Sequence, residues 1–594
     1  MNSISVSGKN WILKEFNEDD VLFLKDNYFL SETLSKLLAI RKIKKEEIQI
    51  YLDPSIKNTL PNPFILKDME LAVKRTSEAI LKKEKLGVFG DYDVDGATST
   101  ALLGKYFQEI KQNFEIYIPD RKNEGYGPSI KGFKLLIENG ANLIFTVDCG
   151  TSSFEPIEFA QNLNTDVLVL DHHQSKIKLP KAYSIINPNR LDDKSKLNYL
   201  CAAGVCFMFL VALNKELRNK NWFISNKIKE PDLLNYLDLV SLGTVCDVVP
   251  LVGLNRAIVK QGLKVLKKKS NIGLKTLLEI CNIQSDLSSY HLGYIIGPRI
   301  NAGGRIGKCS HGANLLLNSD SKESFKLASE LDSYNKERQI LENNLLNDVN
   351  DEVLKHLSDP VLILSGENWH EGIIGIIAAR IKEKYNKPTI IISIKNNFGK
   401  ASARSIIGFD IGSTIISAVE EGILEKGGGH KMAGGFTINK DKIEKFKNFV
   451  TKKFEKMNID MKKQKNLYID SVISPSALNI DFYGQINNLA PFGSGNPEPK
   501  FTIENLKPIN SKIVGEKHIK SILLAADGSS IKTIAFNSVS NEIGAYLLKK
   551  NKKTFNIAGK LSLNEWKGQK NVEFIIDDIS VNKNFENKVP SSNG

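Results

Sequence analysis

The chain has 594 residues, of which 41% are hydrophobic and 25% are charged, and its formal net charge is +13. It is too long for a single hydrophobic core, so about three or four domains of roughly 100–200 residues each are expected. The composition is that of an ordinary globular protein. The excess of Lys and Arg favours a polyanionic partner, although a general bias toward lysine would produce the same charge.

Cysteine spacing and hydropathy exclude several classes of protein. The six cysteines contain no CxxC pair and no zinc-finger spacing, which predicts buried thiols in a reducing compartment. The N-terminal stretch MNSISVSGKNWILKEFNEDD lacks the apolar core of a signal peptide. The longest uncharged apolar run, at 201–213, is shorter than the roughly 20 residues that span a bilayer and predicts a buried helix. We therefore expect a cytoplasmic protein without membrane association.

The first half of the chain predicts an α/β domain. Residues 1–80 are expected to be mostly helical and contain no recognisable motif. Short apolar runs then alternate with helical stretches such as 98–111 and 131–138, which is the pattern of βαβ units and a parallel sheet. These apolar runs lie at 86–89, 143–147, 166–170 and 183–186.

The second half predicts a long helix, a second α/β domain and a β-rich end. Residues 320–357 lack Gly and Pro and carry apolar residues at helical spacing. Strands are expected at 361–365 and 389–393, with a helix at 372–384 between them. The predicted parts are an N-terminal segment at 1–80, a catalytic α/β domain at 81–319, a connecting helix at 320–357, a second α/β domain at 358–458, a β-rich domain at 459–582 and a disordered tail at 583–594.

Three aspartates follow the first strand of the predicted sheet. The segment LGVFGDYDVDGATST places Asp91, Asp93 and Asp95 between a strand and a helix, at the edge where open α/β sheets bind ligands. Carboxylates this close repel one another, and such clusters usually hold a cation. An EF-hand calcium loop is a weaker interpretation, because its twelfth position would be Leu102 instead of Glu and because a strand precedes the segment.

The following strands deliver further candidate ligands to the same edge. The run LIFTV ends at Asp148, the run DVLVL ends at Asp171, His172 and His173, and Asp247 lies in SLGTVCDVVPL. Any one of them could be a helix cap or a core residue, but three consecutive βα units that share the pattern indicate a site. Mixed carboxylate and imidazole ligands suit Mn²⁺ better than Mg²⁺, although Mg²⁺ stays possible. Two such ions would suit phosphoester hydrolysis.

The ordered segments GDYDVDG, VDCG, DHH and GTVCDVVPL resemble the four motifs of the DHH phosphoesterase superfamily. The resemblance implies that Asp148 bridges two manganese ions. It assigns supporting catalytic roles beside the metals to Asp91, Asp171 and His173. The direct metal ligands that it implies are Asp93, Asp95, Asp148, His172 and Asp247.

Later segments carry phosphate-binding chemistry. IGPRINAGGRIG offers Arg299, Asn301 and Arg305 among glycines, and guanidinium groups bind phosphate in a bidentate manner. KASARSIIGFD offers Ser402 and Arg404. Each segment alone would be a turn with a surface arginine.

A glycine-rich segment and a helix complete this second pattern. In KGGGHKMAGGF, the amides of Gly428 and Gly429 are expected to form an anion-binding nest around His430. Together with WHEGIIGIIAARI, these segments resemble the DHH-associated domain. The RecJ-type nucleases of the superfamily bind the 5′-terminal phosphate through the matching Ser and Arg, which implies that role for Ser402 and Arg404. Arg299, Arg305 and Arg121 would assist.

The C-terminal region resembles the OB region of the RecJ-type nucleases. Its aromatic residues could stack bases or form the core, and the core is the expected place for Phe574. They interleave with basic residues and are Phe492, Phe501, Trp566 and Phe574. The resemblance thus implies two α/β lobes joined by a long helix, followed by an OB-fold β-barrel.

The function that the resemblance implies is that of a monomeric 5′→3′ exonuclease for single-stranded DNA. It would release 5′-mononucleotides and act in DNA repair and recombination, with single-strand-binding protein and a RecQ-type helicase as candidate partners. Two alternatives remain open. One is a phosphodiesterase for short oligoribonucleotides or small phosphoesters, and the other is a non-catalytic DNA-binding scaffold.

Overall fold

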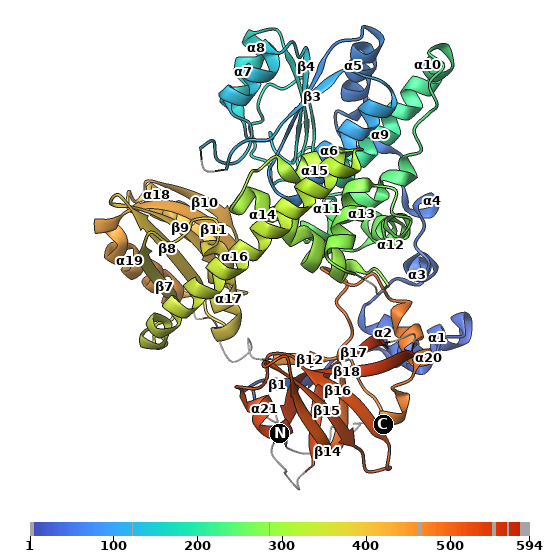
Figure 1. Ribbon diagram of the computed structural model, residues 1–594, viewed down its shortest axis with the longest axis vertical. Helices are drawn as coiled ribbons and strands as arrows, with labels where there is room; N and C mark the ends of the chain where they lie inside the picture. The colour runs from blue at the N-terminus through green and yellow to red at the C-terminus, as the bar shows by residue number, and fades with distance from the viewer. Residues whose placement is uncertain are drawn as a thin grey trace, which may run out of the picture. The chain divides into compact units, whose positions relative to one another are not determined.

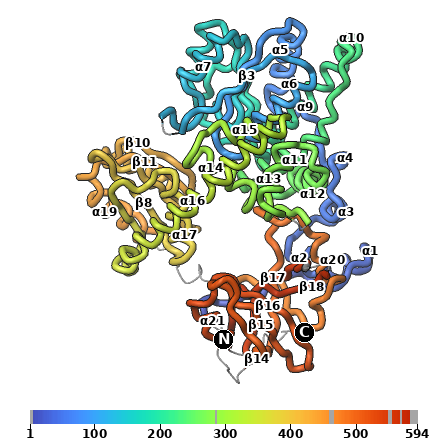
Figure 2. Tube along the Cα trace, in the orientation of Figure 1, coloured from blue at the N-terminus to red at the C-terminus, as the bar shows by residue number. Residues whose placement is uncertain are grey.

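The computed structural model describes residues 5–121, 123–283, 286–457, 459, 466–548, 554–566 and 569–581 (Figures 1 and 2). The tail that the sequence predicts to be disordered, 583–594, lies outside this range. The chain folds as two compact units. One unit comprises the residues up to Asp53 with Asp460–Phe492 and the chain from Asn496 onward, and the other comprises Pro54–Ile459 with Gly493–Gly495.

The larger unit begins with a parallel five-stranded sheet in the order β3-β2-β4-β5-β6. From β2 the chain passes to β3 on one side and then crosses to β4 on the other side of β2, so the topological switch point lies between β2 and β4. The sequence predicts four of these strands and misses β3, a short edge strand without buried residues. Their bounds are β2 Leu86–Gly90, β3 Phe114–Tyr117, β4 Leu143–Val147, β5 Asp166–Leu170 and β6 Ser184–Ile186.

Helices cover both faces of this sheet, because successive strand residues point to opposite sides. Figure 1 shows α5 and α9 on one side of the sheet and α7 and α8 on the other. Phe145 belongs to the core that α5, α6 and α9 share, while its neighbour Ile144 belongs to the core of α7 and α8. Helix α9 contains most of the apolar run that the sequence analysis singles out, and that run is buried as expected. The bounds are α5 Met69–Leu81, α6 Val94–Glu109, α7 Ile130–Glu138, α8 Phe154–Asn162 and α9 Ala202–Asn219.

Further helices surround α6 and complete the first lobe. Apolar side chains of α6, α11, α13, α14 and α15 share a core that continues into the first turns of α16. The bounds of these helices are α10 Trp222–Ser225, α11 Leu237–Cys246, α12 Gly253–Lys267, α13 Ile272–Ile280, α14 Gly297–Arg305 and α15 His311–Leu317.

Helix α16, Ser321–Lys355, runs from the first lobe to the second. It begins at Asp320, whose side chain accepts a hydrogen bond from the amide of Glu323. Its second half packs with α17 on a mixed sheet in the order β10-β11-β9-β8-β7, and α18 and α19 follow on the chain. The bounds are β7 Leu362–Glu367, α17 Ile374–Tyr385, β8 Thr389–Lys395, β9 Phe398–Arg404, α18 Ile411–Glu420, β10 Lys426–His430, β11 Ala433–Asn439 and α19 Ile443–Lys456.

The smaller unit contains a closed barrel. The strands pair in the order β14-β15-β16-β18-β17, and β17 pairs back onto β14 to close the ring. With β16 and β18 parallel and α21 between β16 and β17 on the chain, this is the OB topology, so the predicted fold class is confirmed. The bounds are β13 Ser471–Val472, α20 Ile480–Asn487, β14 Phe501–Val514, β15 His518–Leu524, β16 Ser530–Ala535, α21 Glu542–Leu548, β17 Phe555–Trp566 and β18 Gln569–Ser580.

The N-terminal residues belong to the barrel unit, a relation that the sequence does not reveal. Strand β1, Asn10–Leu13, pairs in parallel with β12, Asn466–Ile469. The indole N–H of Trp11 donates a buried hydrogen bond of 2.9 Å to Asp578. Apolar residues of α1 (Glu18–Tyr28) and α2 (Glu32–Ile40) join the barrel core. The predicted segment 1–80 is therefore divided between the two units.

Two aromatic residues considered for base stacking lie in the barrel core. Phe501 and Phe574 are fully buried. Phe574 is where the sequence analysis expects it, whereas Phe501 cannot stack on a base because none of its ring reaches solvent. Phe492 is half-buried against the same core, and the side chain of Trp566 lies outside the described residues.

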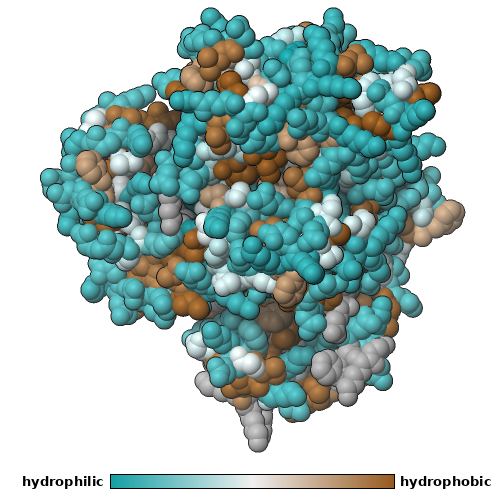
Figure 3. Space-filling view, turned by 45° about the horizontal axis from the view of Figure 1, so that its top comes forward, coloured by the Kyte–Doolittle hydropathy of each residue, from teal (hydrophilic) through white to brown (hydrophobic). Residues whose placement is uncertain are grey.

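One face of the molecule shows the distribution of polar and apolar residues on the surface. On the face shown in Figure 3, hydrophilic residues predominate and hydrophobic ones gather in separate patches. Among the described helices, none is long and apolar enough to cross a membrane.

Glu342 ties α16 to the second lobe, which leads to a stability prediction. Its carboxylate is fully buried, accepts a 2.5 Å hydrogen bond from Arg338 and pairs with Arg380 of α17. Glu342→Ala leaves the half-buried Arg338 without its carboxylate partner and is expected to lower the free energy of unfolding by about 2 kcal/mol, measured by chemical denaturation. Glu352→Ala, on the exposed part of the same helix, is the matched control and should leave stability unchanged. Equal stability of the two variants would contradict this account.

Candidate metal centre

The first part of the site is the turn between β2 and α6. Asp91 follows β2 and is 2% exposed, and Asp93 caps α6 by accepting a 3.1 Å hydrogen bond from the amide of Gly96. A β-carbon at position 96 would lie 2.4 Å from the carbonyl oxygen of Asp91. Glycine is therefore required for the helix to start this close to the strand, and that start brings three aspartates together.

Asp95 is fixed by the beginning of a second helix. Its two carboxylate oxygens accept hydrogen bonds of 2.6 and 3.0 Å from the amides of Ala202 and Ala203 at the start of α9. A helix N-terminus stabilises a carboxylate because the free amides there carry partial positive charge. Gly243 of α11 faces the same carboxylate, and a β-carbon there would lie 2.6 Å from it.

Asp148 occupies the neighbouring strand end, across the topological switch point. Its backbone is left-handed, with φ of +60°, and its amide donates to the carbonyl oxygen of Leu170 at 3.0 Å. Left-handed backbone is uncommon outside glycine, and such strain gathers at functional sites. The carboxylate of Asp148, which is 2% exposed, is thereby held inside the cluster.

Asp171 organises the two histidines that follow it. One of its oxygens accepts hydrogen bonds from the amides of His172 and His173 and lies 2.8 Å from Nδ1 of His173. Burial acts to raise the pKa of Asp171, but the hydrogen bond and charge of His173 lower it overall. Burial acts to lower the pKa of His173, and Asp171 raises it to about 9. This pair is a fixed support beside the cluster.

His172 points the opposite way, into the carboxylates. Its Nε2 lies 3.4 Å from an oxygen of Asp148, 3.4 Å from one of Asp247 and 3.8 Å from one of Asp95. Burial lowers the pKa of His172, which favours the neutral imidazole that binds metals. Asp247 arrives from a different element, since it directly follows α11.

The inward-facing atoms of this cluster lack ordinary partners. Buried polar atoms are normally hydrogen-bonded, so such atoms require an explanation. Within the described residues, four ligand-type atoms of the cluster are buried without a hydrogen-bond partner: Asp91 Oδ1, Asp148 Oδ1, His172 Nε2 and Asp247 Oδ2.

Crowding of these carboxylates raises their proton affinity. Burial, followed by repulsion from the neighbouring aspartates, raises the pKa of Asp247 to about 8. Burial and Asp93 raise the pKa values of Asp91 and Asp148 well above the ordinary range. Burial also raises the pKa of Asp95. The site thus holds more negative charge than the protein itself neutralises.

Three overlapping groups of side chains could each hold a metal ion, with all ligand atoms of a group within 4.8 Å of one another. Asp148 and His172 are each shared by two groups, so the three groups form one continuous site. Unpartnered buried oxygens and a neutral imidazole nitrogen are the donor set that a divalent cation requires. The groups are Asp148 with His172 and His173; Asp95 with His172 and Asp247; and Asp91 with Asp93 and Asp148.

Polar residues that the sequence analysis overlooks support the histidines. The side-chain amide of Asn187 donates 2.8 Å hydrogen bonds to Thr151 and to the carbonyl oxygen of His173, and Asn189 donates to the carbonyl oxygen of His172. Asn187 directly follows β6, and this position at a strand end is the feature of the sequence that could have identified it. Tyr126 donates a 2.9 Å hydrogen bond to the carbonyl oxygen of Asp148.

Arg404 of the second lobe and Arg305 of α14 form a group of cations. Arg404 and Ser402 lie two residues apart on β9, 3.2 Å from each other. A β-carbon at Gly375, in the first turn of α17, would lie 2.9 Å from the hydroxyl of Ser402, so a helix N-terminus adjoins this pair. Arg305 of α14 donates a 3.1 Å hydrogen bond to the carbonyl oxygen of Gly372. Such a combination favours an anion.

Arg305 connects these cations to the acidic cluster. Burial, together with repulsion from Arg121, Arg338 and Arg404, lowers the pKa of Arg305 to about 10, while Asp93 acts in the opposite direction. Arg121 also lies over the ring of Tyr92, 5.4 Å from its centroid. Asn301 precedes Arg305 by one helical turn of α14.

Two elements that the sequence predicts to bind phosphate differ from that prediction, one in its contacts and one in its backbone conformation. The guanidinium of Arg299 pairs with Asp332 of α16 at 2.8 Å, so it holds α14 against α16 instead of facing a phosphate. Gly428, Gly429 and His430 are part of strand β10, paired in an antiparallel manner with β11. An anion nest requires alternating backbone conformations, so the predicted nest is wrong: this backbone is extended.

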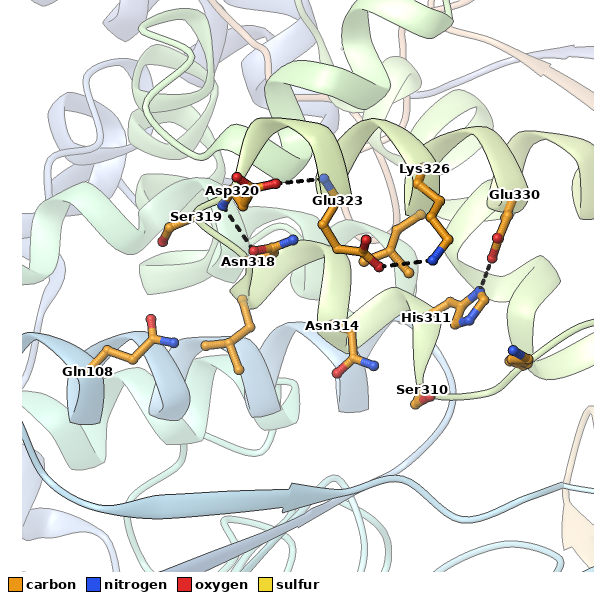
Figure 4. A pocket seen from close by; sticks show the side chains of 13 residues that line it. Gln108, Ser310, His311, Asn314, Asn318, Ser319, Asp320, Glu323, Lys326 and Glu330 are labelled. Carbon is orange, nitrogen blue, oxygen red and sulfur yellow. Dashed lines mark hydrogen bonds and ion pairs between the residues drawn. The ribbon is translucent and has the colours of Figure 1, made fainter.

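A polar pocket of about 780 Å³ lies apart from the metal centre, between α6, α15 and α16 (Figure 4). Its charged groups contact one another: His311 lies 3.2 Å from Glu330, and Lys326 lies 3.5 Å from Glu323. These paired charges leave no excess of cations for a phosphate ligand.

Comparison with known proteins supports a family assignment. Three family models match: the DHH family N-terminal domain at residues 85–244, the DHHA1 domain at 358–456 and the RecJ OB domain at 469–578. The single-stranded-DNA-specific exonuclease RecJ of Escherichia coli (strain K12) is 33% identical over 93% of this chain and 96% of its own length. The chain belongs to the RecJ family. The RecJ of Bacillus subtilis (strain 168) is 29% identical over 97% of this chain and 71% of its own length.

Solved RecJ structures share the fold. The structure of RecJ in complex with Mn²⁺ from Thermus thermophilus matches with a TM-score of 0.79 and 26% identity, over 97% of this chain and 80% of that one. The corresponding Mg²⁺ complex matches with a TM-score of 0.73 and 25% identity, over 97% of this chain and 79% of that one. RecJ of Thermus thermophilus has been crystallised with either ion, and the acidic cluster of this chain offers three groups of side chains that could hold a metal ion.

Replacing one shared ligand should make the metal-free protein more stable and should reduce the stabilisation that added metal gives. In EDTA, Asp148→Asn is expected to unfold at a higher temperature than wild type, because it removes a buried charge whose pKa is raised. The folded protein binds the proton of Asp148 more tightly than the unfolded chain does, so this advantage should narrow as the pH falls through the raised pKa toward the ordinary carboxyl range. Metal at about 100 times its Kd should stabilise wild type by about 2.7 kcal/mol and the variant much less.

The measurement for this prediction is thermal unfolding with Mn²⁺ or with EDTA. Asp348→Asn, at an exposed position of α16, is the control and should respond to metal as wild type does. An Asp148→Asn protein that is stabilised by Mn²⁺ as strongly as wild type would contradict the shared-ligand role.

Proposed function

We propose that this chain is a metal-dependent exonuclease that degrades single-stranded DNA from its 5′ end and releases 5′-mononucleotides. The observation that supports this most directly is the arrangement within the larger unit. A buried acidic cluster with unpartnered ligand atoms adjoins a group of arginines that includes Arg305 and Arg404. Cations beside a metal site suit a polyanionic phosphodiester, and the family assignment points to single-stranded DNA.

The metal ions that we propose are two Mn²⁺, with Mg²⁺ as an alternative. When bound, they supply positive charge that stabilises the developing charge on the phosphate and makes water a better nucleophile. The residues that we assign as ligands are Asp93, Asp95, Asp148, His172 and Asp247. Asp148 belongs to two of the three ligand groups and would hold metal in both of them.

The residues beside the proposed metal ligands hold the ligands and the substrate in position. Asp171 fixes the ring of His173 through their 2.8 Å contact and thereby directs an N–H toward the reacting phosphate. Asp91, buried behind Asp93, adds a carboxylate to the same group. We assign Asp91, Asp171 and His173 these supporting roles, which orient the substrate and the ligands before reaction begins.

We assign the preference for the 5′ end of the strand to residues of the second lobe. We propose that Ser402, Arg404 and the N-terminus of α17 bind the 5′-terminal phosphate, with Arg305, Arg121 and Asn301 close by. A terminal phosphate carries more charge than an internal one and binds more strongly to a buried guanidinium. Anchoring the end beside the metals would place the first phosphodiester bond in the site.

The proposal extends to partners and cellular role. The barrel unit, matched by the RecJ OB domain, would bind more of the single strand. We further propose that the protein acts as a monomer in the cytoplasm, in DNA repair and recombination. Single-strand-binding protein and a RecQ-type helicase are its candidate partners, on the basis of the family resemblance.

The direct test uses a 5′-phosphorylated, 3′-labelled single-stranded oligonucleotide with Mn²⁺. Wild type is expected to produce a ladder of progressively shorter labelled fragments, and EDTA or Asp148→Ala should abolish it because the metal site is lost. A blunt duplex of the same sequence should be degraded far more slowly. Mass spectrometry of the released product should show 5′-mononucleotides.

Each other outcome of that assay has a defined meaning. Cleavage in the middle of the strand would contradict exonuclease action. Cleavage of dinucleotides or small phosphoesters alone would favour the small-substrate phosphodiesterase. Tight binding without any shortening would favour a non-catalytic scaffold.

The end-sensing role gives a separate prediction. Wild type should degrade a 5′-phosphorylated strand with a lower KM than a 5′-hydroxyl strand, and Arg404→Ala should reduce that preference by about 10–100-fold, since a hydrogen bond to a charged group contributes about 1.5–3 kcal/mol. Lys400→Ala, on the same strand but paired with Glu371, should keep the preference. A preference that survives Arg404→Ala would place the phosphate sensor elsewhere.

A further inference from the structure

Two tyrosines before α14 form an exposed aromatic pair. Tyr290 and Tyr294 are 59% and 74% exposed. Their rings stack on each other, with centroids 5.2 Å apart and planes inclined by 22°. The backbone of His291–Ile296 is a π-helical turn, a rare conformation that is frequent at functional sites. Rings that remain this exposed contribute little to the core, so their placement calls for another role.

This turn is packed directly against the metal centre. A β-carbon at Gly293 would lie 3.3 Å from Val245, and one at Gly297 would lie 2.4 Å from the sulfur of Cys246. The thiol of Cys246 also donates to the carbonyl oxygen of Leu292 at 3.4 Å. Val245 and Cys246 directly precede Asp247. The tyrosines therefore stand on a rigid element that borders the Asp247 side of the cluster.

The far end of the same helical run borders the other side of the cluster. A β-carbon at Gly304 would lie 3.0 Å from the carbonyl oxygen of Tyr92, which stands between Asp91 and Asp93. Arg305 follows at once and contacts Gly372 of the second lobe. The run from Tyr290 to Arg305 thus spans the metal centre from its Asp247 side to its Arg305 and Arg404 side.

The positions of the two ends of this helical run fit the 5′-to-3′ direction of the proposed DNA strand. With the 5′-terminal phosphate at the Arg404 side, the rest of the strand leaves the metals in the 3′ direction. Arg305 follows Tyr294 by about three helical turns, at roughly 3.6 residues per turn, so the two side chains lie close to one face of the run. A strand that crosses the metals along this face meets the tyrosines next.

We propose that Tyr290 and Tyr294 form a stacking platform for bases on the 3′ side of the scissile phosphate. This inference rests on the proposed nuclease function and adds a subsite to it. Every base has a π-face, so aromatic stacking holds a strand without selecting its sequence. A platform on a rigid helical turn would also keep the next phosphodiester bond in register with the metals after each nucleotide leaves.

The simpler interpretation is that the rings stack only on each other. Side chains four residues apart on a helix often pair, with a stabilisation of a few tenths of a kcal/mol. That interpretation predicts a small change in stability on substitution and none in DNA binding. The two interpretations therefore differ in the effect that they predict for substitution on DNA binding.

The test combines protein variants with abasic substrates. The variants are Tyr290→Ala/Tyr294→Ala and Tyr290→Phe/Tyr294→Phe, and Tyr183→Ala is the control, an exposed tyrosine at the opposite end of the sheet. Substrates are 5′-phosphorylated single strands with one abasic position at successive distances from the 5′ end. KM and kcat for nucleotide release are measured with Mn²⁺, and Kd is measured in EDTA by fluorescence anisotropy.

The Ala pair is expected to raise KM and Kd about tenfold with kcat changed less than twofold, because stacking on one base contributes about 1–3 kcal/mol. The Phe pair and Tyr183→Ala should behave as wild type. At the positions that stack, an abasic site should weaken wild type about tenfold and the Ala pair no further, since both changes remove one interaction.

Two results would overturn the platform: an Ala pair with the KM and Kd of wild type, or abasic and Ala effects that multiply at every position. The Kd measurement separates this inference from the nuclease proposal. If wild type releases no nucleotide, the nuclease proposal fails, and the anisotropy comparison still decides whether the tyrosines hold bases.

Discussion

The structure depends on the cost of holding several carboxylates together away from water. Like charges at this distance repel, and burial makes each one more expensive to ionise. The fold meets that cost with fixed dipoles behind the cluster: the amides that begin α9 bind Asp95, and the amides of His172 and His173 bind Asp171. Oxygens that face inward remain unpartnered among the described residues, so the charge is balanced either by added protons or by a bound cation.

The same constraint explains the architecture around the site. Parallel strands bring their carboxyl ends to one edge, and the switch point between β2 and β4 separates the helices that would otherwise fill it. Gly96 allows α6 to start close to the end of β2, and Gly243 allows α11 to approach α6 closely. The long helix α16 then joins the second lobe, where its buried Glu342 pairs with Arg380 of α17. Positive groups of that lobe therefore reach the rim of a negative site within one compact unit.

Much of the site was accessible to sequence reasoning because its residues follow strands directly. Asp91, Asp148 and Asp171 each lie at the first position after a buried apolar run, and strand ends at one edge must converge. The role of Arg299 could not be judged in this way, since its partner Asp332 lies on another helix. The glycine-rich stretch around Gly428 was misread as a nest because glycine permits many backbone conformations and only pairing with β11 selects one.

The sequence by itself determined most of the local elements and the order of the acidic motifs, because periodicity and strand-end residues are local properties. The fold class followed from the family that those motifs resemble. The tertiary structure decided which distant segments meet. It joined β1 to β12 across most of the chain, buried Phe501 in the barrel, and set the exposed tyrosine pair beside Asp247. Contacts between residues far apart leave no periodic signal in one sequence, and burial is a property of the packed whole.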